Sequence, residues 1–398
     1  MYHLKSSSDD GTIVSDRIEI LFLIDYFQRT GGTEKHLAQL IAGLPDTFRC
    51  SVVGFDMGLN PLLDELRARG VPVIHLPVAR EYVPNALRQA WRLSRLIRRN
   101  RYDIVQTFHQ KADTYGALVA WVSGARHLVS SKRDTGALRK PLHVFLNRHL
   151  KWLFEAFIVV AEGVRVAVMT NDRLPASRIR TIYNGVDLVR FVAPSSGQRA
   201  EARKCLGFAA EDFVVGMVAA FRAEKNYDVF FDALSRAALA IPSLRVLAVG
   251  GGPLLAETRG RIGGTALGSR TVFTGEVSDV LRCLWSMDVG CLTSGSNEGF
   301  SNAVVELMAV GLPVVVTDVG GNAEAVVHGE NGFVVPPRDA AALARALLEV
   351  HADPVRAAAM GRASRRLAAE RFSLERMCAE HARLYASLCR PARPVSGG

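Results

Sequence analysis

Short apolar runs alternate with amphipathic segments along almost the whole sequence, and this alternation restricts the possible fold more than any other feature. The runs Arg17–Ile24, Cys50–Phe55 and Asp103–Thr107 have the length of strands, and helical patterns such as Leu62–Arg69 lie between them. Strands that are apolar throughout and joined by helices form parallel sheets covered on both faces. We therefore predict an α/β protein built on parallel sheets.

The alternation occurs twice, and at 398 residues the chain is too long for a typical single core. We predict two α/β domains, at residues 17–190 and 213–371. Residues 191–212 are rich in Pro, Ser, Gly and charge and read as the linker between them. A polar leader at 1–16 lacks the apolar region of a secretory signal, and 372–390 contain a helix-like segment. A ligand is expected in the cleft between the two sheets.

The net charge of +10 is concentrated in one part of the first domain. Residues 86–151 contain 14 Lys and Arg against three Asp, a balance of +11. Within them, Ala86–Arg101 and Leu138–Lys151 combine basic and apolar residues at helical spacing. Such helices can lie on an anionic membrane surface. The alternative is an ordinary helix that packs on the core and exposes its arginines. No nucleic-acid recognition motif accompanies the charge, so we expect no nucleic-acid partner.

The cysteines and the hydropathy pattern indicate in which cellular compartment the protein is expected. The six cysteines are scattered, with no Cys-x-x-Cys pair and no histidines at metal-binding spacing. This is typical of reduced thiols in a cytoplasmic protein. No run approaches the roughly 18 apolar residues of a membrane span. We therefore expect a cytoplasmic protein that at most lies on the inner face of the cytoplasmic membrane.

Polar and glycine-rich motifs follow the strands of the second series. Phe221–Asn226 follows its first strand, Gly250–Pro253 its second, and Val319–Glu324 a later one. Because the carboxyl ends of parallel strands meet at one edge of the sheet, these loops are expected to face a common ligand. Arg222 and Lys225 in the first loop are suited to hold a pair of phosphates.

Two carboxylates frame a further loop of this series. Glu298 lies in a turn of small residues, and Glu306 lies about one turn into a helix that we expect to begin near Ser301. A helix N-terminus offers unpaired backbone N–H groups and a positive dipole end. Together these features suit a phosphorylated, polyhydroxylated ligand. The alternative is a capped surface helix with two solvated glutamates. In the first series, Gly31 and Gly32 follow a strand and would let backbone approach a phosphate closely.

Several of these motifs have a fixed order along the chain. Gly-Gly-x-Glu comes first, Asn-Gly-Val-Asp stands at mid-chain, and Phe-Arg-x-x-Lys, Gly-Gly-Gly-Pro, Glu-Gly-Phe-Ser-Asn-x₃-Glu and Asp-Val-Gly-Gly follow. This order resembles the family 4 retaining glycosyltransferases over about residues 17–390. The resemblance implies the GT-B fold, in which two Rossmann-like domains face each other across a cleft. The first would lie on the acceptor side, the second would hold a nucleotide-sugar donor, and the helix in 372–390 would cross back to the first.

The resemblance also implies roles for single residues. Glu298 would contact hydroxyls of the donor sugar, and Glu306 would hold the ribose hydroxyls. Arg222 and Lys225 would bind the diphosphate and, with Glu298, support the reaction. The remaining substrate-binding candidates are Gly31, Gly32, Gly251, Gly252, Phe300, Ser301 and Asn302.

Two positions depart from the family pattern. Many members have an arginine five residues before the lysine, where this sequence has Ala220, and we assume that Arg222 supplies that charge. The His-x-His often found in the first domain is Gln106-Thr107-Phe108 here, with His109 next to it. His109 is therefore a candidate for the acceptor site, and the loop Lys132-Arg133-Asp134 is the alternative.

The implied reaction moves a hexose-type sugar, with retention of configuration, from a UDP- or GDP-linked donor to a hydroxyl of a glycan or lipid-linked acceptor. It would serve cell-surface polysaccharide or glycolipid synthesis. The leaving diphosphate itself would help to deprotonate the acceptor. The sequence contains no Asp-x-Asp, and we expect no cofactor and no essential metal. A nucleotide-sugar 2-epimerase of similar fold and a non-catalytic nucleotide-sugar-binding protein are the alternatives.

Overall fold

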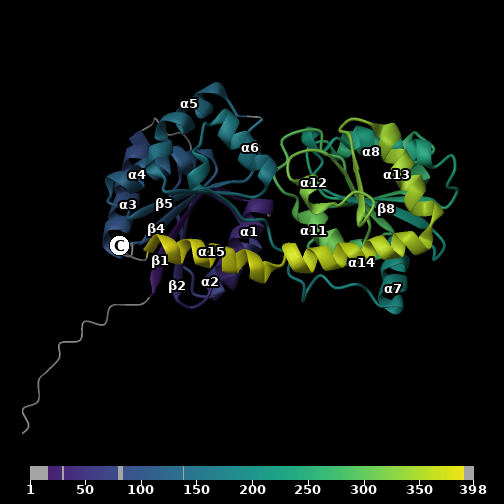
Figure 1. Ribbon diagram of the computed structural model, residues 1–398, viewed down its shortest axis with the longest axis horizontal. Helices are drawn as coiled ribbons and strands as arrows, with labels where there is room; N and C mark the ends of the chain where they lie inside the picture. Colours follow the sequence, from purple (N-terminus) through teal and green to yellow (C-terminus); the bar gives the residue numbers. More distant parts are fainter. Residues whose placement is uncertain (1–16, 29–30, 79–83, 138, 390–398) are drawn as a thin grey trace, which may run out of the picture.

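The computed structural model describes residues 17–28, 31–78, 84–137 and 139–389, and it contains two parallel sheets (Figure 1). The first has seven strands in the order β3-β2-β1-β4-β5-β6-β7, and the second has six in the order β10-β9-β8-β11-β12-β13. Both follow the order 3-2-1-4-5-6 of a Rossmann sheet, with β7 added to the first. The predicted α/β class with two Rossmann-like parallel-sheet domains is confirmed. The predicted leader at 1–16 lies outside the described residues.

The first domain contains the following elements. Its strands are β1 (Ile18–Phe27), β2 (Phe48–Met57), β3 (Val73–His75), β4 (Ile104–Phe108), β5 (His127–Lys132), β6 (Ala156–Val159) and β7 (Ile179–Thr181). Its helices are α1 (Gly32–Gly43), α2 (Pro61–Ala68), α3 (Pro84–Asn100), η1 (Ala112–Gly116), α4 (Ala117–Val122), α5 (Pro141–Leu150), η2 (Lys151–Leu153), α6 (Glu162–Asn171) and η3 (Ala176–Arg178).

The second domain and the C-terminal helices complete the fold. The strands are β8 (Phe213–Val218), β9 (Leu244–Val249), β10 (Thr271–Gly275), β11 (Val289–Leu292), β12 (Val314–Thr317) and β13 (Gly332–Val335). The helices are α7 (Ser196–Leu206), η4 (Ala223–Lys225), α8 (Tyr227–Ala237), α9 (Leu255–Gly263), η5 (Gly268–Arg270), α10 (Leu281–Ser286), α11 (Asn302–Ala309), α12 (Asn322–Ala325), α13 (Ala340–Ala352), α14 (Pro354–Arg371) and α15 (Leu374–Cys389).

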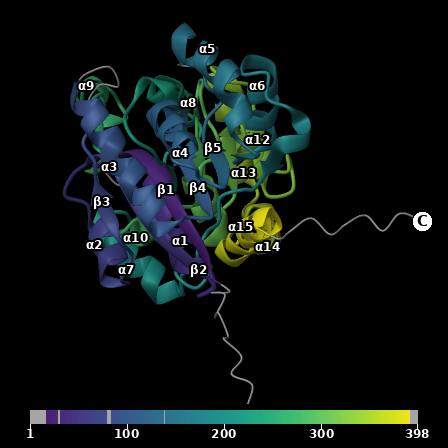
Figure 2. The same ribbon diagram turned by 90° about the vertical axis from the view of Figure 1, so that its left-hand side faces the viewer.

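Strand β1 shows why apolar runs without alternation form the centre of these sheets. Ile20, Phe22 and Ile24 belong to the core cluster that includes Leu37 of α1. Leu21 and Leu23, which alternate with them, belong to the cluster that includes Leu93 of α3. Because successive side chains of a strand point to opposite faces, both faces of β1 are buried under helices. Figure 2 shows α3 and α4 on the outer side of this domain.

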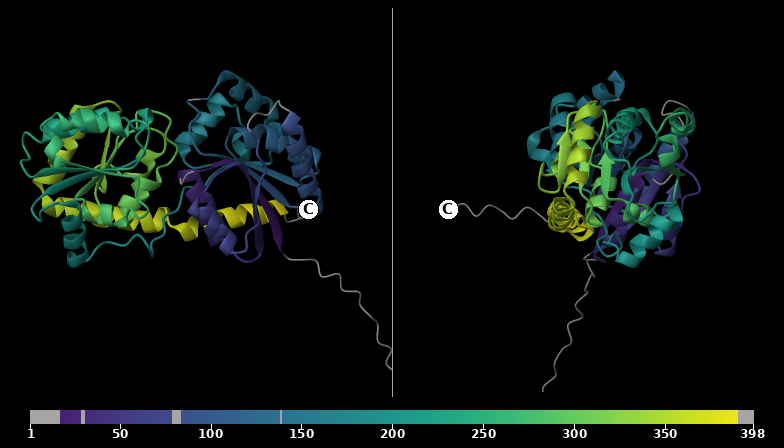
Figure 3. Two further views of the ribbon diagram at one scale, coloured as in Figure 1. Left: turned by 180° about the vertical axis from the view of Figure 1, so that it is seen from behind. Right: turned by 90° about the vertical axis from the view of Figure 1, so that its right-hand side faces the viewer.

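The C-terminal helix, which we predicted to cross back to the first domain, packs against α1. Figure 3 shows α14 and α15, in yellow, running in succession along both domains. Tyr385 of α15 is fully buried in the core cluster of the first sheet and donates a hydrogen bond of 2.7 Å to Gln106 of β4. The chain turns toward the first domain at Ser373, which pairs with Val186 in an isolated bridge. Helix α15 therefore completes the core of a domain whose other helices and strands end with β7 at Thr181.

The segment 191–212, which we predicted as a linker, contains helix α7. Its N-terminus is a capping box, in which Ser195 and Gln198 each accept a hydrogen bond from the other's backbone N–H. Arg199 and Arg203 of this helix bind Asp288, at 2.6 Å each. Part of the predicted linker is thus attached to the second domain.

Candidate active site

The loops that follow β8, β9, β11 and β12 lie at the edge of the second sheet that faces the first domain. Contacts across the cleft are direct. The Asn184 side chain donates to the carbonyl oxygen of Phe300 at 3.1 Å and to Asn302 Oδ1 at 2.7 Å. A Cβ atom on Gly299 would lie 2.0 Å from the carbonyl oxygen of Arg133, so the two backbones are in contact there. The candidate residues around Glu298 are therefore enclosed by both domains.

Glu298 is buried and paired with Lys225. The Lys225 Nζ lies 2.5 Å from Glu298 Oε2, which also accepts a hydrogen bond of 2.6 Å from the Ser294 hydroxyl. Thr293, directly after β11, donates to the backbone carbonyl of Lys225 at 3.0 Å and so fixes the turn that presents the lysine. The structure thus joins two predicted site residues that are 73 positions apart in the sequence.

The glycines after β9 support the turn that presents Arg222 and Lys225. Gly252 has a φ of +144°, and a Cβ there would lie 2.6 Å from the carbonyl oxygen of Phe221. A side chain at this position would push the Phe221–Lys225 turn away from the sheet. Phe221 N–H in turn donates to the carbonyl of Gly251 at 2.8 Å. Gly251 and Gly252 therefore lie next to the predicted phosphate-binding residues.

The Gly31–Gly32 loop lies against the N-terminus of α11. Ser301 occupies the N-cap position of α11, and its hydroxyl makes no capping hydrogen bond. Asn302 donates to the carbonyl of Gly32 at 3.4 Å. Burial raises the pKa of Glu34 in α1, and the charges of Arg133 and Arg222 oppose this shift. Arg222 of the second domain is therefore close enough to influence a carboxylate beside the glycine loop of the first.

Glu306 is buried and has a partner that we did not predict. Lys35 of α1 forms an ion pair of 3.7 Å with Glu306 Oε1 across the cleft. Burial raises the pKa of Glu306, and the Lys35 ammonium opposes this shift. The position of Lys35 directly after Gly-Gly-x-Glu could have indicated this pair, because the glycine loop was already expected to close over the second domain.

His109 and Arg133 lie on the first-domain side of the cleft. His109 has a φ of +72°, and its Nε2 lies 3.3 Å from the Thr33 hydroxyl of α1. Burial, together with the charge of Arg133, lowers the pKa of His109 to about 4. Burial also lowers the pKa of Arg133 to about 9. Arg133 donates to Asn184 at 2.8 Å, and its other terminal nitrogen is buried without a hydrogen-bond partner among the described residues. Both acceptor-site candidates therefore face one region, next to the glycine loop.

The loop after β12 holds the domains together at a second place. Glu324 of α12 accepts hydrogen bonds from the backbone N–H groups of Glu162 and Gly163, at 2.9 and 2.7 Å. These are the first residues of α6 in the other domain, where a carboxylate is favoured by the helix dipole. Tyr183 donates to the same carboxylate at 2.7 Å. Sequence reasoning gave Glu324 no role, because nothing local shows that its partners lie over 140 residues away.

The described residues contain no helix long and apolar enough to cross a membrane. The same part of the chain contains no group of three or more His, Cys, Asp and Glu side chains that could hold a metal ion. The expectation that no metal is essential stays a prediction.

Comparison with known proteins gives two family matches that together span both domains. Residues 198–367 match the model described as "Glycosyl transferases group 1", and residues 30–190 match the one described as "Glycosyltransferase Family 4". The putative glycosyltransferase EpsD of Bacillus subtilis is 31% identical over 247 residues, which cover 60% of this chain and 62% of EpsD. The chain thus spans less than two thirds of the length of that relative.

Two further similarities cover most of the chain. The GDP-mannose-dependent alpha-(1-6)-phosphatidylinositol monomannoside mannosyltransferase of Mycolicibacterium smegmatis is 28% identical over 366 residues, 89% of this chain and 94% of that protein. The crystal structure of Anabaena HepE in complex with UDP and glucose superposes with a TM-score of 0.84 at 24% identity, covering 93% of this chain and 100% of HepE. The likeness to HepE concerns the fold.

Proposed function

The chain belongs to the family 4 glycosyltransferases, and we propose that it moves a hexose-type sugar from a nucleoside diphosphate sugar to a hydroxyl of a glycan or lipid-linked acceptor. The transfer would retain the anomeric configuration and need no essential metal. A role in polysaccharide or glycolipid synthesis is supported by relatives such as the mannosyltransferase named for phosphatidylinositol monomannoside. UDP and GDP are both candidates for the donor nucleotide, because the HepE structure contains UDP and the mannosyltransferase is named as GDP-mannose-dependent.

The observation that carries the proposal is the group formed by Lys225, Glu298 and the N-terminus of α11. A cation, a buried carboxylate and an uncapped helix end share one edge of the second sheet, and the Gly31–Gly32 loop faces them from the first domain. The phosphate oxygens of a diphosphate would accept hydrogen bonds from the Lys225 ammonium and from the backbone N–H groups at the start of α11. The sugar hydroxyls would donate to Glu298. The ribose would lie toward Glu306, one helical turn further.

The chemistry follows from where charge develops during the reaction. As the bond from the anomeric carbon to the diphosphate breaks, negative charge grows on the phosphate oxygens. Fixed donors aimed at that charge lower the barrier, because they need no reorganisation when the bond breaks. We assign this role to Lys225, Arg222 and the first turn of α11. The incoming hydroxyl would attack on the face that the diphosphate leaves and would transfer its proton to a phosphate oxygen.

The acceptor would enter from the first domain, beside His109 and Arg133. At neutral pH His109 is uncharged, because burial lowers its pKa to about 4. It can then accept a hydrogen bond from an acceptor hydroxyl, but it cannot neutralise an anion. Arg133 carries the positive charge of this region and has a nitrogen without a partner among the described residues. We propose that Arg133 positions the acceptor or the donor phosphate and that His109 orients the hydroxyl.

A membrane surface is part of the proposal. The predicted basic helices both leave apolar side chains exposed: Leu87 and Trp91 on α3, and Leu142 and Phe145 on α5. Helix α3 also buries Leu93 in the core. It therefore packs on the core, as in the ordinary-helix interpretation, and also exposes apolar side chains, as in the membrane-surface interpretation. Exposed aromatic and basic residues on one domain suit the headgroup region of an anionic membrane. Co-sedimentation with phosphatidylglycerol vesicles at low salt tests this, and an absence of binding would exclude it.

The first experiment is a screen of UDP- and GDP-sugars for thermal stabilisation and for slow hydrolysis, since a bound donor raises stability by mass action. With the donor in hand, Lys225→Ala and Glu298→Ala should each lower the rate at least about 100-fold, as expected for groups that stabilise a transition state. Lys204→Ala and Glu349→Ala remove one exposed charge of each sign from the same domain and serve as controls.

Three outcomes would contradict the proposal. Turnover like that of the wild type in either site variant would show that the assigned roles are wrong. Conversion of the donor into its epimer without any acceptor would identify an isomerase. Tight donor binding with neither hydrolysis nor transfer to any acceptor would identify a binding protein.

A further inference from the structure

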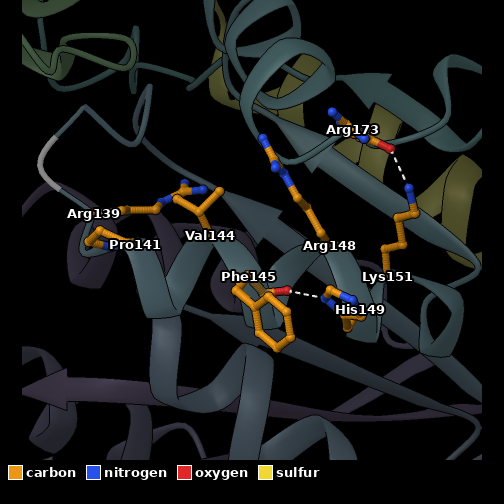
Figure 4. A pocket seen from close by; sticks show the side chains of 8 residues that line it. All are labelled: Arg139, Pro141, Val144, Phe145, Arg148, His149, Lys151 and Arg173. Atoms are coloured by element: carbon orange, nitrogen blue, oxygen red, sulfur yellow. Dashed lines mark hydrogen bonds between the residues drawn. The ribbon is translucent and has the colours of Figure 1, made fainter.

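A basic hollow on the outer side of the first domain plays no part in the donor site. It has a volume of about 610 Å³ and lies along α5 and the start of η2. Figure 4 shows the side chains of Arg148, Lys151 and Arg173 on one side and those of Arg139 and Val144 on the other. A smaller hollow of about 300 Å³ shares Arg139, Val144 and Arg148 with it and extends to Gly136 and Ala137.

The charge of the hollow is only partly compensated. Among its four lining Arg and Lys residues, Arg139 is the one with ion pairs in the described part of the chain, to Asp172 at 2.6 Å and Asp134 at 3.2 Å. Arg148 and Lys151 bind neutral backbone carbonyls instead, at 2.8 and 2.7 Å. These bonds fix the two side chains, so an anion would not have to order them. The hollow is therefore a preformed cationic site.

One wall of the hollow is apolar and leads to an exposed apolar surface. Val144 and Phe145 line the hollow, and the Phe145 ring packs against His149 with a centroid distance of 3.9 Å and an angle of 33° between the ring planes. Leu142, on the same helix, and Trp152, in η2, are both more than half exposed beside it. A molecule with a phosphate in the hollow could thus lay an organic portion along α5.

The hollow is connected to the donor site through one short loop. Ala137 N–H and the Thr135 hydroxyl both donate to Asn297 Oδ1, at 3.2 and 3.3 Å. Asn297 precedes Glu298 and adopts a left-handed backbone conformation with a φ of +47°. The loop that closes one end of the smaller hollow is therefore hydrogen-bonded to the residue before the predicted sugar-binding carboxylate.

We propose that this hollow binds a phosphate or diphosphate group of the acceptor and thereby holds the acceptor beside the donor site. The inference rests on the proposed transferase function and narrows the acceptor to a phosphate-bearing molecule. Two oxygens of the phosphate would accept hydrogen bonds from Arg148 and Arg173, and Lys151 would add a point charge. The group could come from a phospholipid-type acceptor or from a soluble phosphorylated glycan, since both present the same chemistry.

Calorimetric titration of the full chain with inorganic pyrophosphate and with octyl phosphate tests the proposal and separates the two sources. The double variant Arg148→Gln/Arg173→Gln should bind octyl phosphate at least tenfold more weakly than the wild type. The matched control is Arg69→Gln/Arg180→Gln, which removes two exposed arginines of the same domain outside the hollow; in the wild type Arg180 binds backbone carbonyls much as Arg148 does. Tighter binding of octyl phosphate than of pyrophosphate indicates a lipid-type acceptor, and equal binding indicates a soluble one.

The donor site also attracts phosphate, so each titration is repeated in Lys225→Ala. Binding that survives Lys225→Ala but falls in the hollow variant supports the proposal. Donor hydrolysis by the hollow variant should stay within twofold of the wild type, which separates a failure of this inference from a failure of the transferase assignment. Equal affinities of the wild type and the hollow variant for both probes would overturn the proposal. Binding to phosphatidylglycerol vesicles without binding of either probe would overturn it too, because the cations would then serve a membrane surface alone.

Discussion

Replacing Glu324 with alanine should weaken the closed arrangement of the two domains without unfolding either one. The Glu324 carboxylate belongs to the second domain, and its three donors belong to the first: the N–H groups of Glu162 and Gly163 and the Tyr183 hydroxyl. All three bonds are lost when the domains separate. They contribute to the equilibrium between closed and open forms and not to the core of either sheet.

The size of the effect follows from these bonds. A hydrogen bond to a charged group contributes about 1.5–3 kcal/mol when buried. Because Glu324 is only half-buried, we take about 0.7–1 kcal/mol for each bond, within the range for ordinary hydrogen bonds. A total of about 2–3 kcal/mol corresponds to a shift of about 30- to 150-fold in the ratio of closed to open forms.

Small-angle scattering and donor affinity measure this shift. The Glu324→Ala variant should have a larger radius of gyration and weaker donor binding, because donor binding is proposed to need both domains. For Glu324→Gln, the radius of gyration and the donor affinity should lie between those of the wild type and of Glu324→Ala, since the amide offers one acceptor oxygen where the carboxylate offers two. Tyr183 provides a local probe. Burial raises its pKa and Glu324 raises it further, so the pKa of Tyr183 should fall in the alanine variant.

Glu349→Ala is the matched control, because Glu349 forms an exposed ion pair with Arg356 at 3.5 Å in the same domain. It should leave scattering and donor affinity unchanged. If Glu324→Ala behaves like Glu349→Ala in both measurements, the contact with α6 does not hold the domains closed. A fall in the unfolding free energy of the second domain by the full 2–3 kcal/mol would also refute the reasoning, since the bonds would then stabilise the fold and not the closure.

Three further predictions concern the cleft and the core of the first domain. Gly299→Ala should lower transfer at least tenfold with little loss of stability, measured by paired kinetics and thermal unfolding, because its Cβ would lie 2.0 Å from the Arg133 carbonyl and force the domains apart. Burial lowers the pKa of His381 to about 4, so this side chain takes up a proton more readily in the unfolded state than in the folded state. The free energy of unfolding should therefore fall as the pH drops from 6.5 toward 4. Between pH 7.5 and 5, urea unfolding should show a decrease in this free energy that is about 2 kcal/mol smaller in His381→Gln than in the wild type. Lys35→Ala should raise the pKa of Glu306 further, so as the pH is lowered the donor affinity measured by calorimetry should begin to fall at a higher pH than in the wild type; superimposable pH profiles would contradict this.

The fold could be predicted well because its signals are local. Apolar runs of strand length and the helical pattern between them placed Asp103–Thr107 within one residue of β4 (Ile104–Phe108), and Leu62–Arg69 within one residue of α2 (Pro61–Ala68). Right-handed crossover connections, which βα units share, reduce the possible strand orders to a few but do not select one of them. Helix α7 was missed although the capping box at Ser195 and Gln198 was visible, because the Pro, Ser and Gly content was given more weight than the capping pattern.

The site could be predicted only in part, because its pairings join distant residues. The motifs indicated Lys225 and Glu298 separately, but not that each is the other's partner. Lys35 was not recognised, since a lysine on an amphipathic helix usually faces water. The Asn-Gly-Val-Asp motif was noticed without a role, and the structure shows Asn184 bridging to the backbone and side chain at the start of α11. Such contacts depend on how two domains meet, which no local pattern encodes.

The ion pair between Lys225 and Glu298 also determines how variants of the donor site have to be compared. A buried carboxylate that loses its cation is destabilised strongly, so Lys225→Ala removes a phosphate ligand and at the same time leaves Glu298 uncompensated. Loss of activity in that variant alone does not separate the two effects. The double variant Lys225→Ala/Glu298→Gln removes both charges together. If Lys225 acts on the diphosphate, the double variant should be more stable than Lys225→Ala and no more active, because stability depends on the balance of charge while catalysis depends on the cation.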